Sequence, residues 1–436
     1  MATDPERRAD VDEDELASSF SDVIVPLDTA APDAPTDDIA AIGRAIGDAD
    51  VIGMGEASHG TREFFRFKHR LFQHLVADRN VRMLGLEANF AALLDVNEYV
   101  LNGDGTAEDA LSRESIHRVY RTESLLELIE WCRSFNEGRP RDERIRFHGI
   151  DVQHAGAAGT RLETFFRTAD PGVLETVEDA LDRLTTTGLP AFSDDGAVRA
   201  HLEARTSVAS TLGDALDANE AAYVEATSRD RYEVASRLVW MIERGRDQLE
   251  AIAEGRTDSG ANLRIRDSAM AAQVQWLLAH EPADRIVLWG HNAHLARGWF
   301  AGGRQRQRQR IPSLGSNLAG LSDVEYYALG LTLGGGSVGA VSGGEYRAYE
   351  IDAPPEGSLP AVFGDLDPAA FFFDVEHLEP DSTAREWLDS RPRWFDITGG
   401  YRDSPVSLVE SNVPTQFDGL VFFGETTAAR PLEAER

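Results

Sequence analysis

The chain has little cysteine and no long hydrophobic run. Its 436 residues include one cysteine, Cys132, which excludes an internal disulfide and a cysteine-based metal cluster. Cys132 lies in the helical pattern LLELIEWCRSF, so a packed core thiol is predicted. No segment reaches the roughly 18 apolar residues needed to span a bilayer, and the N-terminus lacks the apolar region of a signal peptide. We therefore expect a cytoplasmic protein with no membrane partner.

Lysine is almost absent. The 43 basic residues include a single lysine, Lys68, and 75 acidic residues bring the net charge to -32. An acidic, lysine-poor surface is typical of proteins that stay soluble in high salt, where a Debye length of about 3 Å at 1 M screens self-repulsion. The composition predicts a halophilic protein that binds no nucleic acid; an ordinary acidic protein with compositional bias is the alternative.

Short apolar strands alternate with amphipathic helices through most of the chain. Six strands are predicted, at residues 51–54, 81–87, 144–151, 286–289, 324–333 and 417–425. This alternation predicts an α/β fold with a mostly parallel central sheet flanked by helices. The charged, strand-free stretch from about 160 to 262 predicts a helical insertion. Residues 1–20 are expected to form a flexible acidic leader, and residues 21–436 a single α/β hydrolase-like domain.

Four predicted strands end in polar residues. The residues at or just beyond these ends are Glu56, Glu87, Asp151 and His291. Because the carboxyl ends of parallel strands share one edge of a sheet, where open α/β sheets bind their ligands, these side chains are expected to meet. One strand that ends in an acid means little, but four such ends predict a site.

The turn after the first strand holds Glu56 and His59, three residues apart. A carboxylate beside a histidine fixes its tautomer and raises its basicity, which is how a general base is built. The alternative is a capping turn in which both side chains bond only backbone amides. Lys68 lies on the helix that begins beside His59 and could pair with Glu56 or Glu87, or bind a substrate oxygen; a leftover surface lysine is the alternative.

A second polar turn contains His291 and His294, again three residues apart beyond a buried strand. These histidines could hydrogen-bond a carbonyl, donate a proton or, with Glu56 and His59, ligate a metal. Two satisfied loop histidines are the alternative, and the zinc-peptidase pattern H-E-x-x-H is absent. The string GGSVG around Ser337 matches the serine-hydrolase pattern, but no helix is predicted after it, which argues against a nucleophilic serine.

Five blocks of the chain, in this order and spacing, resemble the erythromycin esterase family: GEASHGTREFFRFKHRL, LGLEA, FHGID, VLWGHNAHLARG and FDGLVFFGETTAARPL. The resemblance extends from about Asp38 to Leu432 and is weakest in the helical stretch. It implies an α/β core with a helical insertion covering a carboxyl-end cleft. It also implies a hydrolase that cleaves an ester or lactone, as in macrolide antibiotics, without a nucleophilic serine.

The resemblance also assigns roles by position. The six matching positions are Glu56, His59, Lys68, Glu87, His291 and His294. His59 matches the histidine that activates water, and Glu56 the acid of the same turn. Protonated His291 or His294, with Lys68, is then expected to stabilise the oxyanion that forms on the substrate.

No metal or other cofactor is predicted, and the expected partner is a small-molecule ester or lactone. Two alternatives stay open. The first is a metal-dependent hydrolase built on the same Glu/His cluster, which metal analysis and chelation would reveal. The second is a non-enzymatic ligand-binding protein, for example for haem, which visible absorption would reveal.

Overall fold

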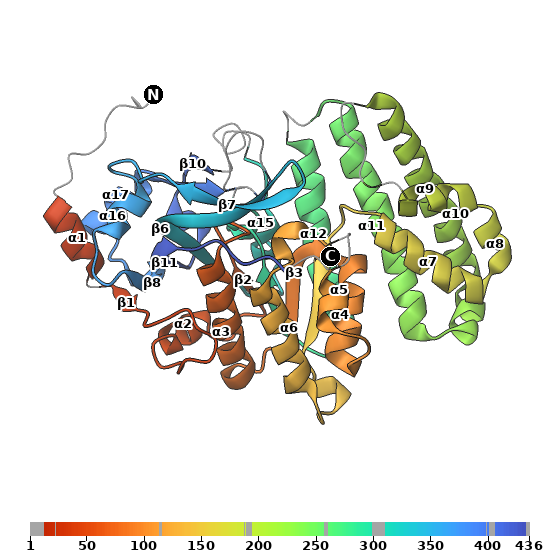
Figure 1. Ribbon diagram of the computed structural model, residues 1–436, viewed down its shortest axis with the longest axis horizontal. Coiled ribbons are helices and arrows are strands. Elements are labelled where there is room, and N and C mark those ends of the chain that lie inside the picture. The colour runs from red at the N-terminus through yellow and green to blue at the C-terminus, as the bar shows by residue number, and fades with distance from the viewer. Residues whose placement is uncertain are drawn as a thin grey trace.

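A central sheet organises the computed structural model (Figure 1), in the order β1-β8-β11-β6-β2-β5-β3-β4 with β7 paired to β6. The structure describes residues 13–21, 23–112, 116–186, 188, 194–256, 260–298, 310–397, 399–400 and 406–432. The strands are β1 Ile24–Pro26, β2 Val51–Met54, β3 Met83–Asn89, β4 Arg146–Asp151, β5 Ile286–Trp289, β6 Tyr326–Ser342, β7 Glu345–Ile351, β8 Ala370–Asp374 and β11 Gly419–Thr426. A separate two-stranded sheet pairs β9 Arg393–Ile397 with β10 Val406–Glu410.

Helices connect and cover these strands. The α-helices of the first half are α1 Glu13–Ser21, α2 Ala40–Ile46, α3 Arg62–Asp78, α4 Phe90–Asn102, α5 Ala107–Leu111, α6 Glu123–Asn136, α7 Gly156–Ala169, α8 Pro171–Glu175, α9 Glu178–Thr186 and α10 Asp195–Ala226. Those of the second half are α11 Arg229–Ala253, α12 Ala261–His280, α13 Asn292–Leu295, α15 Leu314–Ala319, α16 Leu359–Gly364, α17 Thr383–Asp389 and α18 Val413–Gln416. Three short 3-10 helices are η1 Arg118–Tyr120, η2 Arg141–Glu143 and η3 Val375–His377.

The six strands from β11 to β4 are parallel, as the sequence predicts, and the antiparallel pairs described in this sheet are β1–β8, β8–β11 and β6–β7. All residues of β2 and β5 are buried, because helices cover both faces of a parallel sheet. Alternate side chains point to opposite faces. Val287 and Trp289 thus pack with α3 and α6, whereas Ile286 and Leu288 pack with α12 and α15. The predicted fold class is confirmed.

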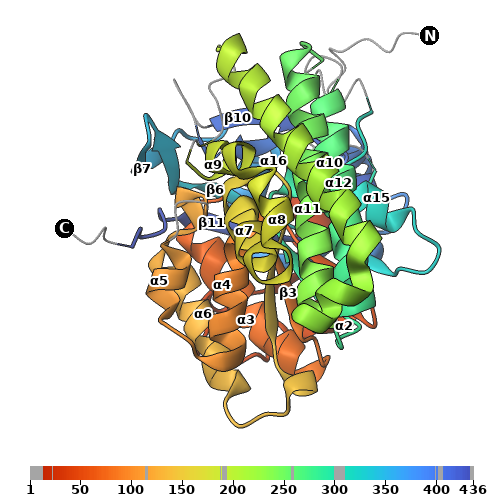
Figure 2. The ribbon, with the colours of Figure 1, turned by 90° about the vertical axis from the view of Figure 1, so that its right-hand side faces the viewer.

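The stretch predicted to be helical, about 160–262, contains α7 to α11 in its described residues. Figure 1 shows these helices together at the β3 end of the sheet, and Figure 2 shows them in front of the strands. The link to the core is α12, which follows them and packs on β4. This helical bundle therefore lies next to the edge of the sheet that ends in β4.

The N-terminal segment differs from the flexible leader expected over residues 1–20. Residues 13–21 form α1, in which Leu16 and Phe20 are buried. The Phe20 ring makes edge contacts with Phe363 at 5.1 Å and Trp387 at 5.8 Å between ring centroids. The spacing of four residues puts both apolar side chains on one helix face, which the acidic composition of the segment obscured. Residues 1–12 lie outside the described residues.

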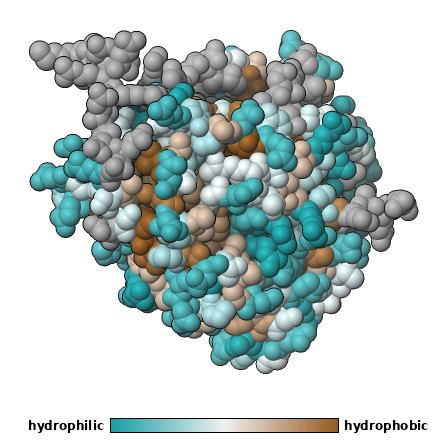
Figure 3. All heavy atoms as spheres, turned by 60° about the vertical axis from the view of Figure 1, so that its left-hand side comes forward, coloured by the Kyte–Doolittle hydropathy of each residue, from teal (hydrophilic) through white to brown (hydrophobic). Residues whose placement is uncertain are grey.

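Figure 3 shows a face dominated by hydrophilic residues, with hydrophobic ones gathered in a few small areas. Among the described residues, no helix combines the length and the hydropathy needed to cross a bilayer.

The turn between β2 and α3 is fixed by a close backbone contact. Gly60 accepts a hydrogen bond of 2.8 Å from the Gly339 amide of β6. A Cβ atom on Gly60 would lie 1.9 Å from the Gly339 carbonyl oxygen, so only glycine fits here. The contact holds the end of the polar turn against the sheet.

We expect Gly60→Ala to lower the free energy of unfolding by about 1–3 kcal/mol, because the added methyl group must displace backbone. Urea denaturation measures the change. Gly335→Ala is the matched control, since a Cβ atom there meets no heavy atom within 4 Å. Equal stability of the two variants would show that the contact is not tight in solution.

Candidate active site

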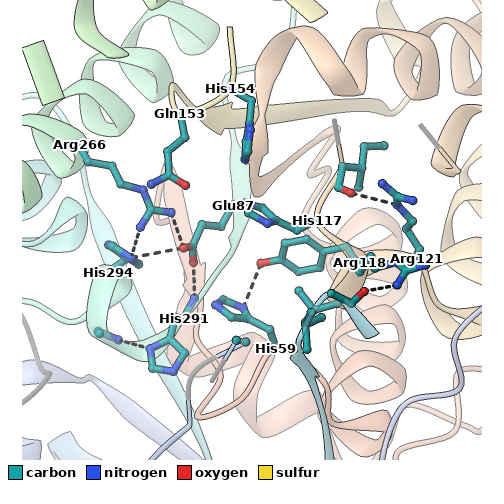
Figure 4. A pocket seen from close by; sticks show the side chains of 18 of the residues that line it. His59, Glu87, His117, Arg118, Arg121, Gln153, His154, Arg266, His291 and His294 are labelled. Atoms are coloured by element: carbon teal, nitrogen blue, oxygen red, sulfur yellow. Dashed lines mark hydrogen bonds and ion pairs between the residues drawn. The ribbon is translucent and has the colours of Figure 1, made fainter. Parts of the chain in front are cut away.

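A cavity of about 560 Å³ opens at the carboxyl ends of β2, β3, β4 and β5. Its lining includes His59, Glu87, His117, Tyr120, Gln153, His154, Arg266, His291 and His294 (Figure 4). Four of the six predicted site residues are therefore in the lining. The other two, Glu56 and Lys68, lie behind His59 and are fully buried.

Glu56 is the centre of a buried polar cluster. Its Oε1 lies 2.8 Å from His59 Nδ1, and its Oε2 accepts hydrogen bonds from Lys68 Nζ at 2.7 Å and Trp289 Nε1 at 2.9 Å. Lys68 Nζ also lies 4.7 Å from the centroid of the Trp289 ring, a cation–π geometry. The three elements that supply these side chains, the β2–α3 turn, α3 and β5, are thereby joined.

Glu56 and Lys68 each stabilise the charged form of the other. Burial alone would raise the pKa of Glu56, but Lys68 and His59 lower it below its usual value. Burial lowers the pKa of Lys68 to about 8, although Glu56 opposes the shift. At neutral pH Glu56 is therefore an anion and Lys68 a cation.

The ionised Glu56 fixes the tautomer of His59. A carboxylate only accepts hydrogen bonds, so the proton on His59 sits on Nδ1 and is donated to Glu56. This leaves a lone pair on Nε2. Among the residues that the structure describes, Nε2 has no hydrogen-bond partner, and the ring lines the cavity. His59 is thus arranged as a base that faces the cavity.

A second charged group surrounds Glu87 of β3. Glu87 Oε1 lies 2.8 Å from Arg266 Nη2, and Oε2 accepts the His291 backbone amide at 2.8 Å. Arg266 of α12 also contacts Asp151 at 2.7 Å. Burial would raise the pKa of Glu87, but His294, His59 and Arg266 hold it well below its ordinary value.

His294 lies between this group and α12. Its Nδ1 lies 2.8 Å from Asp267 Oδ1, and its Nε2 is 2.9 Å from Arg266 Nη1 and 3.3 Å from Glu87 Oε1. The shorter contact is with a guanidinium that is always a donor, so Nε2 accepts in this arrangement and Nδ1–H donates to Asp267. Burial lowers the pKa of His294, but Asp267 and Glu87 outweigh it and raise the pKa above its usual value.

His291 is held as a neutral imidazole. Its Nδ1 accepts the Ala293 backbone amide at 3.2 Å, and its Nε2 lies 3.3 Å from the Ala57 carbonyl oxygen. Only the tautomer with a proton on Nε2 fits both contacts. Burial lowers the pKa of His291 further, although Asp396 opposes the shift.

Two expected roles need correction. Lys68 is fully buried against Glu56 and does not line the cavity, so it cannot reach a substrate oxygen. His291 is expected as a protonated oxyanion partner, but its hydrogen bonds favour the neutral form. The reason is the same in both cases: the protons of these side chains are committed to protein acceptors.

The Glu/His cluster does not fit a metal ion. The Glu56 carboxylate is bonded to Lys68, and the Glu87 carboxylate and the His294 imidazole are bonded to Arg266. Two fixed cations thus occupy the positions beside the oxygen and nitrogen ligands. Within the described ranges, no group of three or more His, Cys, Asp or Glu side chains has a metal-binding arrangement.

Ser337 is not placed as a nucleophile. It lies inside β6, which continues past the glycines of the GGSVG string and pairs Ser337 with Glu350 of β7. A nucleophile elbow requires a sharp strand-to-helix turn. The Ser337 hydroxyl instead accepts the Ala428 backbone amide at 3.2 Å.

The helical insertion is expected to cover the carboxyl-end cleft. Among the described residues, none from 160–262 lines the cavity. Arg205 of α10 is fully buried and donates a hydrogen bond of 2.8 Å to the Gln153 carbonyl oxygen. Through this contact the insertion supports the loop that carries Gln153 and His154.

Several cavity residues escaped the sequence reasoning. They are His117, Tyr120, Gln153, His154 and Arg266. His154 follows Asp151 closely at a predicted strand end, so its place near the site could have been predicted from the sequence. Arg266 lies within a helix that has many arginines nearby. Tyr120 lies in a 3-10 helix between α5 and α6, and no local pattern marks it.

The chain matches the model of a known family. The family model for erythromycin esterase matches residues 76–426. The chain belongs to the erythromycin esterase family. The match includes Glu87, His291 and His294, whereas Glu56 and His59 precede it.

Relatives of the family cover most of the chain. The Bacillus subtilis (strain 168) protein YbfO is 23% identical over 414 residues, which are 92% of this chain and 89% of YbfO. The Escherichia coli erythromycin esterase type II is 26% identical over 373 residues, 77% of this chain and 83% of that protein. A crystal structure of an erythromycin esterase mutant in its open conformation has the same fold, with a TM-score of 0.69, 18% identity and coverage of 93% and 98% of the two chains. Family membership indicates a hydrolase.

We expect Lys68→Met to lower the free energy of unfolding at pH 7 by about 3–5 kcal/mol, because it leaves the buried Glu56 carboxylate unpaired. Urea denaturation measures the loss. The double variant Glu56→Gln/Lys68→Met removes both charges and should recover most of the stability. A loss below about 1 kcal/mol in the single variant, the range of exposed pairs, would contradict the buried pair.

Proposed function

We propose that this protein hydrolyses a carboxylic ester or lactone with a water molecule that His59 activates. The observation that carries the proposal is the bare Nε2 of His59 in the cavity, with Nδ1–H held by the buried Glu56. A base of this kind typically contributes 10²–10⁴-fold to a rate. Esterase relatives and family membership support an ester bond as the target.

In the proposed reaction, the water oxygen attacks the carbonyl carbon while His59 Nε2 takes the water proton. The carbonyl electron pair moves to the oxygen and forms a tetrahedral intermediate. The intermediate collapses, the bond to the alcohol oxygen breaks, and the His59 imidazolium returns its proton to the leaving alkoxide. Glu56 stabilises the imidazolium between these steps without being protonated, because its pKa is low.

The group around Glu87 shapes the opposite side of the cavity. Figure 4 shows Arg266 and His294 on one side of Glu87, and His117 on the other. Arg266 keeps its charge, because Asp151 and Glu87 raise its pKa although burial lowers it. Because that charge is paired with Glu87 and Asp151, Arg266 holds this wall of the cavity in place.

The cavity suits a small-molecule substrate. Its volume of about 560 Å³ falls within the roughly 300–1,000 Å³ of pockets for drug-sized ligands. Imidazole, phenol and guanidinium groups in its lining can hydrogen-bond the carbonyl and hydroxyl oxygens of an ester or lactone. An ester and lactone series, tested at high salt as the composition suggests, is the screen that identifies the substrate.

We expect His59→Ala to lower kcat for ester hydrolysis by at least about 10²-fold, because no other base replaces Nε2. The far-UV circular dichroism spectrum and the melting temperature should stay near those of the wild type. His377→Ala is the control, since His377 is an exposed histidine of η3 outside the cavity lining. Turnover of His59→Ala within a few-fold of the wild type would overturn the assignment.

Incubation with EDTA followed by dialysis should leave the hydrolysis rate unchanged, because Lys68 and Arg266 occupy the positions beside the carboxylates. Rate assays and total metal analysis of the same sample measure this. Loss of activity that returns with one added divalent metal would favour the metal-dependent alternative.

A further inference from the structure

The proposed hydrolysis requires a hydrogen-bond donor for the carbonyl oxygen, on which negative charge develops. The donors expected from the sequence do not serve. Lys68 is buried behind Glu56, and the His291 Nε2–H faces the Ala57 carbonyl oxygen. His294 donates from Nδ1 to Asp267, and its Nε2 accepts from Arg266. The donor must therefore be another group in the cavity lining.

Tyr120 lines the cavity directly beside the base. Its hydroxyl oxygen lies 3.1 Å from His59 Nδ1, and its side chain is almost fully buried. The ring makes an edge contact with His59, 5.6 Å between centroids, and packs at 6.5 Å from Phe65 of α3. These contacts fix the position of the hydroxyl relative to the imidazole.

The position of Tyr120 in the chain is also fixed by backbone contacts. The Tyr120 amide donates to the His117 carbonyl oxygen, and the Thr122 amide donates to the Tyr120 carbonyl oxygen, each at 2.9 Å. The C-terminal segment pairs with this stretch through the bridge from Thr122 to Pro431. The hydroxyl is thus held by the fold and does not depend on a substrate for its position.

Counting protons shows where the hydroxyl hydrogen points. Glu56 accepts at 2.8 Å from His59 Nδ1, so Nδ1 carries a proton and has no lone pair to offer Tyr120. The Tyr120 oxygen can only accept a share of that proton, and its own hydrogen must turn elsewhere. Within the described part of the chain, Nδ1 is the one hydrogen-bond partner of this hydroxyl, and it is a donor. The free direction is the cavity.

The hydroxyl keeps its hydrogen at any working pH. Burial raises the pKa of Tyr120 well above its ordinary value, and the nearby Glu87 and Glu56 carboxylates raise it further. A neutral phenol in a buried site is a fixed donor that needs no reorganisation when charge develops.

We propose that Tyr120 donates this hydrogen bond to the carbonyl oxygen of the substrate and is a further catalytic residue, acting on the oxyanion. The inference rests on the proposed hydrolysis. As water adds to the carbonyl carbon, the electron pair moves to the carbonyl oxygen, and the Tyr120 O–H shortens its contact with that oxygen. The phenol proton stays on Tyr120 throughout, while His59 carries the proton taken from water.

The test is Tyr120→Phe, which keeps the ring packing against His59 and Phe65 and removes only the hydroxyl. We expect kcat to fall by about 10²–10³-fold, the usual cost of one oxyanion donor, with KM little changed. Tyr326→Phe is the matched control, since this buried hydroxyl donates to the Leu295 carbonyl oxygen outside the cavity. It should keep the wild-type kcat.

A binding measurement separates donation from a structural role. A phosphonate analogue of the best ester mimics the charged intermediate, so its affinity should fall in Tyr120→Phe by a factor close to the loss of kcat. The same fall is expected when Tyr120→Phe is placed in the His59→Ala background, where catalysis plays no part. A lower kcat with unchanged phosphonate affinity would overturn the proposal in favour of a positioning effect on His59.

The two hypotheses fail in different ways. If the wild type hydrolyses esters, His59→Ala does not and Tyr120→Phe turns over like the wild type, the role of Tyr120 is wrong and the proposed function stands. If the wild type hydrolyses no ester or lactone of the series, the proposed function itself is wrong, and the role of Tyr120 falls with it.

Discussion

The buried ion pair between Lys68 and Glu56 is the interaction on which the site depends. Without the ammonium at 2.7 Å, a fully buried Glu56 would favour the neutral acid. A protonated Glu56 could donate to His59 Nδ1, and the base would then lose its defined tautomer. The pair also connects α3 with the turn after β2, and Trp289 extends the connection to β5. The same contacts that complete the core thus set the chemistry of the histidine.

The use of lysine in this pair stands out against the composition of the chain. Arginine is the basic residue everywhere else in the chain, and Lys68 is the single lysine. The Lys68 side chain is fully buried, and its Nζ lies 4.7 Å from the centroid of the Trp289 ring. An ammonium is a compact point charge that needs less space than a planar guanidinium. Arg266, by contrast, uses its fork to contact Glu87, Asp151 and His294 together.

The sequence predicted those parts of the site that local patterns encode. Apolar strands followed by polar residues placed Glu56, Glu87 and His291 at one sheet edge, and β2, β5 and β3 are indeed neighbours in register. Tyr120 could not be predicted in this way, because its place depends on a pairing with the C-terminal segment that is remote in sequence. The sequence left two possibilities open for Lys68, an inward-facing residue paired with an acid or a surface lysine. Helical spacing gives the direction of a side chain but not how deeply it is buried. The extension of β6 beyond its glycines depended on pairing with both β11 and β7.

The single lysine also allows the central claim to be tested directly. Protein labelled with 13C at lysine Cε gives one lysine NMR signal, which reports the titration of Lys68 alone. A base held by a buried pair predicts a Lys68 pKa of about 8 and a further decrease in Glu56→Gln, where the neighbouring charge is lost. Titration near the ordinary lysine value of about 10.4, unchanged in Glu56→Gln, would contradict the pair and with it the assignment of His59 as the base.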